Sequence, residues 1–199
     1  MKRVKPLLAT ILAVVAACST QKKQPAPAAA PSAAGSGVVA GTAPPGSIVA
    51  LVPAAGEAPM PEGPAVMDQY AKSFVPNVLY VRVGQPVEFR NSEDENHNVN
   101  VTRRASGTAV FGVGTEPHQK YVHTFDRAGQ YDVACDIHPG MQALVVAASS
   151  ALVTIANEQG AFSIPNVPAG AYKVALTFEG QTVERPLEVK APRTDVKMP

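Results

Sequence analysis

The chain has 199 residues, and its 17 lysines and arginines against 16 aspartates and glutamates give a formal net charge of +1. This balance provides no basic stripe for binding nucleic acid, and the length allows one or two small domains. The chain lacks tryptophan and has 15 glycines and 19 prolines, which favours an all-β protein of strands and turns over a helical bundle.

Residues 1–17 have the pattern of an export signal. Lys2, Arg3 and Lys5 make a charged start, and residues 6–17 are apolar. Twelve apolar residues are too few for a membrane-spanning helix, which needs about 20. Without the three cations the chain keeps 14 positive and 16 negative side chains, so the mature protein is expected to be slightly acidic.

The signal ends in Val15-Ala16-Ala17-Cys18, which resembles a bacterial lipobox. The resemblance implies cleavage before Cys18 and lipidation of that residue, whereas an ordinary cleavage site near Ala17 is the alternative. Ser19 follows the cysteine, as in lipoproteins sent to the outer membrane. We therefore expect a lipoprotein on the periplasmic side of a bacterial membrane, with the outer membrane favoured.

Residues 18–36 are rich in proline, alanine and serine and hold almost no large apolar side chain. Such a segment cannot bury enough surface to offset the entropy of ordering. We interpret it as a semi-extended tether between the lipid and the first folded domain, or as a spacer without a tuned length.

If Cys18 carries lipid, Cys135 is a lone thiol in an oxidising compartment, which is unusual. It begins the segment Cys135-Asp-Ile-His138-Pro-Gly-Met141, which holds a thiolate, an imidazole and a thioether within seven residues. A trigonal set of two histidines and one cysteine with a weak axial methionine is typical of blue copper sites. An inert buried thiol is the alternative for Cys135, and core packing is the alternative for Met141.

The residues before Cys135 alternate as in a strand. Tyr131, Val133 and Cys135 share one face, so the cysteine should project into a core at the end of the strand. Pro139-Gly140 then turns the chain, and residues 144–147 begin the next strand. A short loop between two strands would hold His138 and Met141 around the sulfur.

A second histidine has to come from elsewhere in the chain. His97 follows the acidic turn Glu93-Asp94-Glu95 and precedes the alternating run Asn98-Val-Asn-Val101, so it lies where a loop enters a strand. His118 lies in a turn-like stretch, and His123 is expected on the solvated face of a strand. These two histidines are weaker candidates for a second metal site. The acidic turn is expected to be solvated, or to steer a basic partner.

At these residues the sequence resembles the cupredoxins. The matching pieces are residues 94–99, residues 124–135 and His138-Pro-Gly-Met141, and the two-residue gap between His138 and Met141 resembles the amicyanin loop. The resemblance implies a Greek-key β-sandwich over residues 66–148 and one copper ion, cycling between Cu(I) and Cu(II), held by His97, Cys135, His138 and Met141. It also implies that Asn98 braces the ligand loop and donates to the thiolate, and that the ring edge of the His138 ligand is the electron port.

The remaining segments resemble a small carboxypeptidase-regulatory-like β-sandwich, which methylamine-utilisation-type exported proteins combine with a copper module. Residues 37–65 hold its first strands and residues 149–199 the remainder, so we predict that the copper domain is inserted into the small domain. A tandem order, with residues 37–60 packed on the copper domain, is the alternative. The tail has no cluster of ionisable residues, which indicates a structural or docking role.

Taken together, the sequence predicts an all-β, periplasm-facing type 1 copper protein that transfers single electrons between redox protein partners such as a cytochrome, a dehydrogenase or an oxidase. Four ligands leave no open position for a substrate, so we expect no enzyme activity. The alternative is a copper-binding lipoprotein for storage, delivery or tolerance, although the five methionines and four histidines of the chain are few for that role.

Overall fold

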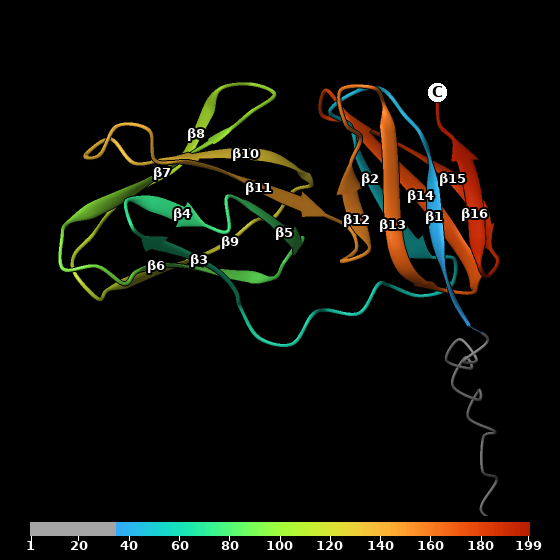
Figure 1. The fold of residues 1–199 in the computed structure, drawn as a ribbon, viewed down its shortest axis with the longest axis horizontal. Coiled ribbons are helices and arrows are strands. Elements are labelled where there is room, and N and C mark those ends of the chain that lie inside the picture. Colours follow the sequence, from blue (N-terminus) through green and yellow to red (C-terminus); the bar gives the residue numbers. More distant parts are fainter. Residues whose placement is uncertain (1–34) are drawn as a thin grey trace, which may run out of the picture. The chain divides into compact units, whose positions relative to one another are not determined.

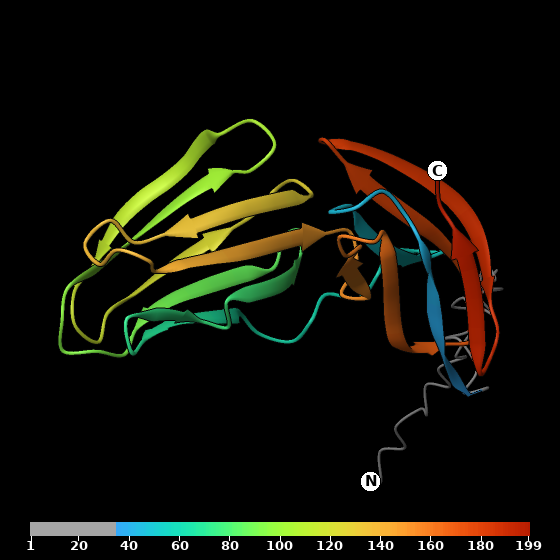
Figure 2. The same ribbon diagram turned by 45° about the horizontal axis from the view of Figure 1, so that its top comes forward.

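The computed structural model describes residues 35–199, and the predicted signal, Cys18 and nearly all of the tether lie outside them. The described chain consists of strands and turns, as expected for an all-β protein, and it contains no helix long and apolar enough to cross a membrane. The strands, drawn in Figures 1 and 2, are β1 (Ser36–Thr42), β2 (Ile48–Pro53), β3 (Ala65–Tyr70), β4 (Ser73–Val75), β5 (Val78–Arg82), β6 (Pro86–Asn91), β7 (His97–Arg103), β8 (Thr108–Thr115), β9 (Lys120–Thr124), β10 (Gly129–Ala134), β11 (Gln142–Ala148), β12 (Val153–Ile155), β13 (Ala161–Pro168), β14 (Gly170–Phe178), β15 (Gln181–Val189) and β16 (Arg193–Lys197).

Strands β3 to β11 form one sandwich, called the ligand sandwich below. Its sheets have the strand orders β4-β3-β6-β9 and β5-β11-β10-β7-β8. The pairs β3–β6 and β5–β11 are parallel and the others antiparallel. The predicted alternation of β10 is confirmed, because Tyr131 and Val133 are buried whereas Gln130, Asp132 and Ala134 are half-buried. Tyr131 and Val133 belong, with Phe89 and Phe125, to an apolar core between the sheets. Burial of each large apolar side chain there stabilises the fold by about 1.5–3 kcal/mol.

Strands β1, β2 and β12 to β16 form a second sandwich. Its sheets have the orders β13-β1-β16 and β12-β2-β14-β15, around a core that includes Val39, Leu51 and Ile164. Strands β1 and β2 thus precede the ligand sandwich in the sequence, but their partners follow it. Strands β1 and β16 are parallel. They approach each other so closely at Gly41 that an added Cβ atom would collide with the Val196 carbonyl oxygen.

Strand β11 is buried on both faces, which explains its uninterrupted apolar sequence. Val145 and Ala147 point into the core of the ligand sandwich. Leu144, Val146 and Ala148 instead form a separate buried cluster with Ile48 and Ala50 of β2. The run at residues 144–148 therefore contributes to two cores.

Candidate copper centre

Cys135 follows directly after β10, and its thiol faces the core as the alternation predicts. It is 6% exposed and belongs to the apolar cluster of the ligand sandwich. The loop after it returns to β11 within a few residues. Its ends are tied because the Cys135 backbone N–H donates to the Met141 carbonyl at 3.1 Å, and Gly140 turns the chain with φ +89°.

His97 is the first residue of β7, where it pairs with Thr115 of β8. Its position at a strand entrance agrees with the sequence analysis, and its side chain is fully buried. The loop between β6 and β7 and the loop between β10 and β11 lie at the same end of the ligand sandwich, the left end in Figures 1 and 2. This common end brings the distant histidine to the Cys135 loop.

Three donor atoms converge there, and their spacing fits one metal ion. The ligand atoms of His97, Cys135 and His138 all lie within 4.8 Å of one another. The two Nδ1 atoms are 3.0 Å apart, and the Cys135 Sγ is 3.8 Å from the His97 Nδ1. With metal bonds of about 2.0 Å to nitrogen and 2.3 Å to sulfur, these separations correspond to angles of about 97° (N–metal–N) and 124° (S–metal–N). The residues present therefore fit a metal bound through a thiolate and two imidazoles, a donor set that suits copper.

Met141 supplies the fourth donor type. Its side chain is 1% exposed and packs in the same buried cluster as Cys135. Its backbone N–H donates to the His138 carbonyl at 3.4 Å, so the loop carries both residues as one unit. Of the four side chains only that of His138 reaches solvent appreciably, with 20% of it exposed.

Two carboxylates contact the far edges of the histidine rings, which the sequence analysis missed. The His97 Nε2 lies 2.7 Å from the Glu93 Oε2, and the His138 Nε2 lies 3.1 Å from the Glu95 Oε2. With a metal bound at Nδ1, each Nε2–H would donate a hydrogen bond to its carboxylate, which would fix the ring orientation. The expectation of a solvated acidic turn holds for Asp94 and Glu95, whose side chains are 96% and 52% exposed, and is wrong for Glu93, which is only 19% exposed.

Lys72 completes this arrangement. Its ammonium lies 3.0 Å from the Glu95 Oε2, and its backbone N–H points at the Glu93 carboxylate from 3.3 Å. The hydrogen bond from Lys72 lowers the pKa of Glu95, and the His138 ring lowers it to a smaller extent, against the opposing effect of desolvation. A four-residue spacing such as that of Glu93 and His97 indicates a contact only on a helix, whereas Glu93 lies in a loop and His97 begins a strand. Nothing in the local sequence indicates the contact between Glu95 and His138.

A buried polar network supports the turn that carries the acidic residues. Gln69 is fully buried, donates to the Asn98 carbonyl at 2.9 Å and accepts from the Thr115 hydroxyl at 2.6 Å. The Asn91 amide donates to the carbonyls of Glu95 and Thr115 at 2.8 and 2.9 Å. These bonds satisfy groups that would otherwise be costly to bury and hold the start of β7 in place.

Asn98 connects the two ligand-bearing loops. Its Oδ1 accepts the backbone N–H of Asp136, the residue after the cysteine, at 2.8 Å. The neighbouring Asn100 amide also donates to the Asp136 carboxylate at 2.6 Å. Donation from Asn98 to the thiolate stays a prediction.

The other two histidines lie outside the donor cluster. His118 contacts Asp94, with Nε2 and Oδ1 2.9 Å apart. The prediction that His123 lies on a solvated strand face is wrong, because β9 alternates so that His123 points inward with Tyr121. Its ring packs against Phe111 and Phe125 at 4.6 and 4.8 Å between centroids, and burial lowers its pKa.

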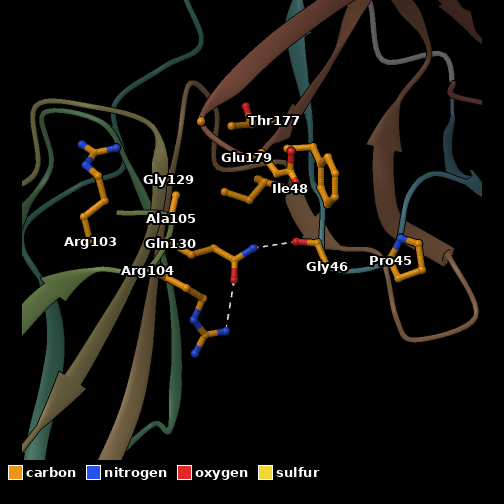
Figure 3. A pocket seen from close by; sticks show the side chains of 12 residues that line it. Pro45, Gly46, Ile48, Arg103, Arg104, Ala105, Gly129, Gln130, Thr177 and Glu179 are labelled. Atoms are coloured by element: carbon orange, nitrogen blue, oxygen red, sulfur yellow. Dashed lines mark hydrogen bonds between the residues drawn. The ribbon is translucent and has the colours of Figure 1, made fainter. Parts of the chain in front are cut away.

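A cavity of about 270 Å³ lies elsewhere, and none of the four ligand side chains lines it. Figure 3 shows Gln130 at its wall, where the amide donates to the Gly46 carbonyl at 2.6 Å and accepts from Arg104 at 3.3 Å. Arg103, also drawn there, donates to the Tyr131 hydroxyl at 2.8 Å. The arginines are thus held by protein groups, and the cavity is separate from the metal ligands.

Comparison with known proteins agrees with this geometry. Residues 64–148 match the family of copper binding proteins described as the plastocyanin/azurin family. Amicyanin from Paracoccus denitrificans is 35% identical over 86 residues, which are 43% of this chain and 66% of that protein. The chain thus spans slightly less than two thirds of the length of this curated relative.

Among solved structures, a reduced Cu(I) form of an amicyanin variant is 32% identical and covers 45% of this chain and 86% of its own, with a TM-score of 0.40. A purple cupredoxin from Nitrosopumilus maritimus is 23% identical and covers 42% and 99%, with a TM-score of 0.38. The matches leave the second sandwich unidentified. Residues 64–148 are thus similar to the amicyanin-like cupredoxins of the plastocyanin/azurin family, and His97, Cys135, His138 and Met141 form a single copper site there.

Proposed function

We propose that the protein is a single-electron carrier with a type 1 copper centre. The observation that carries the proposal is the convergence of the two Nδ1 atoms and one thiol sulfur, with His97 and Cys135 buried and His138 half-buried. Copper bound to this donor set cycles between Cu(I) and Cu(II) and so accepts and releases one electron.

The protein groups favour a site that changes little between the two oxidation states. The Cys135 N–H bond to the Met141 carbonyl and the Asp136 N–H bond to the Asn98 side chain close the loop through main-chain and side-chain contacts within the protein. The carboxylates of Glu93 and Glu95 hold both imidazoles from outside. The positions of the ligands are therefore set by the fold, and this lowers the reorganisation energy of electron transfer.

The electron enters and leaves through His138 in this proposal. His97, Cys135 and Met141 are 6% exposed or less, whereas the His138 side chain is 20% exposed. Ile137 beside it is 50% exposed and adds an apolar contact. Partners would be redox proteins such as a cytochrome, a dehydrogenase or an oxidase that dock against this end of the domain.

Potentiometry tests the proposal against copper storage or delivery. We expect the copper-loaded protein to titrate reversibly as a one-electron couple and to exchange electrons with ferricyanide and ascorbate without releasing the ion. Release of copper on reduction would contradict the electron-carrier proposal and support the delivery alternative.

We also propose that residues 37–65 and 149–199 form one carboxypeptidase-regulatory-like module that carries the copper domain as an insertion. The pairing of β1 with β13 and β16, and of β2 with β12 and β14, supports this division. If it holds, a chain from which residues 66–148 are replaced by a short linker should still give a cooperative, all-β unfolding transition. A chain that remains unfolded would contradict the proposal.

Finally, we propose that the protein is exported and anchored by lipid on Cys18, on the sequence pattern alone. Cells that express the chain and grow with a radioactive fatty acid should label it, and the Cys18→Ser variant should carry no label. Equal labelling of the two proteins would contradict lipidation at this residue.

A further inference from the structure

The Glu95 carboxylate touches a copper ligand on one side and a hairpin turn on the other. The Glu95 Oε2 lies 3.1 Å from the His138 Nε2 and 3.0 Å from the Lys72 Nζ. Its backbone carbonyl is also fixed, because the buried Asn91 amide donates to it at 2.8 Å. A side chain that is 52% exposed is thereby held by two partners, and its backbone by a third.

The hairpin turn that carries Lys72 has an unusual backbone. Tyr70 pairs with Ser73, which leaves Ala71 and Lys72 as a two-residue turn with φ of +51° and +52°. Turns of this kind prefer asparagine and glycine, because other residues are strained in the left-handed region. Strained positions gather where function constrains them. Here the turn directs the Lys72 backbone N–H at Glu93 and its ammonium at Glu95.

From these contacts we propose that Glu95 is a positioning residue for the exposed copper ligand, with Lys72 as its counter-ion. Glu95 accepts a hydrogen bond from the His138 Nε2–H, which keeps Nδ1 directed at the metal, and its negative charge favours Cu(II) over Cu(I). Lys72 orients the carboxylate and partly offsets that charge. The inference rests on the proposed electron-carrier function, and it assigns the tuning of the surface ligand to a residue outside the ligand loop.

Glu95→Gln removes the negative charge but keeps the hydrogen bond, since the amide oxygen still accepts from the His138 Nε2–H. At a fixed solution potential we expect the Cu(I) to Cu(II) ratio of the full chain to rise roughly three- to tenfold through loss of a nearby negative charge. Asp94→Asn is the matched control, because it removes the same charge from the same turn without touching His138. We expect less than a twofold change there, and equal shifts in the two variants would overturn the inference.

Glu95→Ala removes the hydrogen bond as well. In the NMR spectrum of the Cu(I) protein, the Nε2 proton of His138 should be protected from exchange with water in the wild type and in Glu95→Gln, and lost in Glu95→Ala. Protection that persists in Glu95→Ala would overturn the positioning role.

Lys72→Met should act through Glu95. We expect it to lower the Cu(I) to Cu(II) ratio roughly threefold in the wild-type background, and to have a much smaller effect in the Glu95→Gln background, as expected for coupled residues. Equal effects in both backgrounds would overturn the coupling. A wild-type protein without an intense Cu(II) charge-transfer band would overturn the proposed function, and this inference with it. A normal band together with unchanged Cu(I) to Cu(II) ratios in the variants would overturn the inference alone.

Discussion

The two sandwiches differ in what they bury. The second sandwich encloses an almost wholly apolar core, and the buried polar side chains in its segments are Ser47 and Ser150. The ligand sandwich buries a larger set of polar side chains: Gln69, Gln85, Glu88, Asn91, His97 and Thr115.

Burying polar groups is costly unless they are hydrogen-bonded. Gln69, Asn91 and Thr115 meet that requirement by bonding to one another and to the main chain beside His97. The comparison shows that part of the core next to the metal site is polar rather than apolar, and that its hydrogen bonds hold the ligand geometry. The second sandwich shows no such concentration of polar groups.

The largest effect is expected in the second sandwich. A Cβ atom at Gly41 would collide with the Val196 carbonyl, so Gly41→Ala should destabilise this sandwich by about 3 kcal/mol or more, while the copper spectrum at 25 °C is retained. Urea unfolding followed by circular dichroism and by copper absorbance checks both statements. Gly114→Ala is the control, since no atom lies within 4 Å of its added Cβ. Joint loss of both signals at the same urea concentration would show that the cores are not independent.

The polar network of the ligand sandwich is tested by Gln69→Leu. The variant leaves the Thr115 hydroxyl and the Asn98 carbonyl without their partner, which should cost about 1–3 kcal/mol and broaden the copper EPR lines as His97 loosens. The exposed Gln142 gives the control variant Gln142→Ala, with an expected change of less than about 0.5 kcal/mol. A Gln69→Leu protein as stable as the wild type would mean that the network does not support the site.

Met141 and Met67 are both fully buried in the ligand sandwich, but only Met141 lies in the loop that carries Cys135 and His138. Met141→Leu should keep the charge-transfer band and raise the reduction potential, since the axial donor tunes it, by roughly the 59 mV that a tenfold change in a one-electron equilibrium represents. Met67→Leu should leave the potential unchanged. Equal potentials in the two variants would argue against axial ligation.

The smallest effect concerns His123, a half-buried polar group outside the network. Burial lowers its pKa below the usual 6.5, so the unfolded chain takes up a proton before the folded one as the pH falls through 6.5. The free energy of unfolding should therefore decline as the pH falls below 6.5. In His123→Phe the decline measured by urea titration at pH 7 and 5.5 should be smaller. An unchanged decline would contradict this assignment.

The sequence was informative where the site is local. Cys135, His138 and Met141 lie within seven residues, and alternation before Cys135 gave the direction of its side chain. His97 could be placed at the entrance of a strand for the same reason. These features depend on strand periodicity and on one tight loop, both of which are visible in a single sequence.

The supporting residues could not be found in this way. The Glu95–His138 contact requires two loops 43 positions apart to meet, and the Gln69 network requires the parallel pairing of β3 with β6. His123 was misplaced because β9 is short and its inward face is only half-buried. For the Glu95–His138 contact and the Gln69 network, the missing information is how distant segments pair, which local propensity does not contain.

The central claim is that Cys135 and the two histidines form a type 1 copper centre, and the optical and EPR spectrum after addition of one equivalent of Cu(II) tests it most directly. We predict an intense visible charge-transfer band that ascorbate bleaches and that is absent from the Cys135→Ser variant. A pale spectrum with ordinary tetragonal copper parameters, the same in both proteins, would contradict the claim.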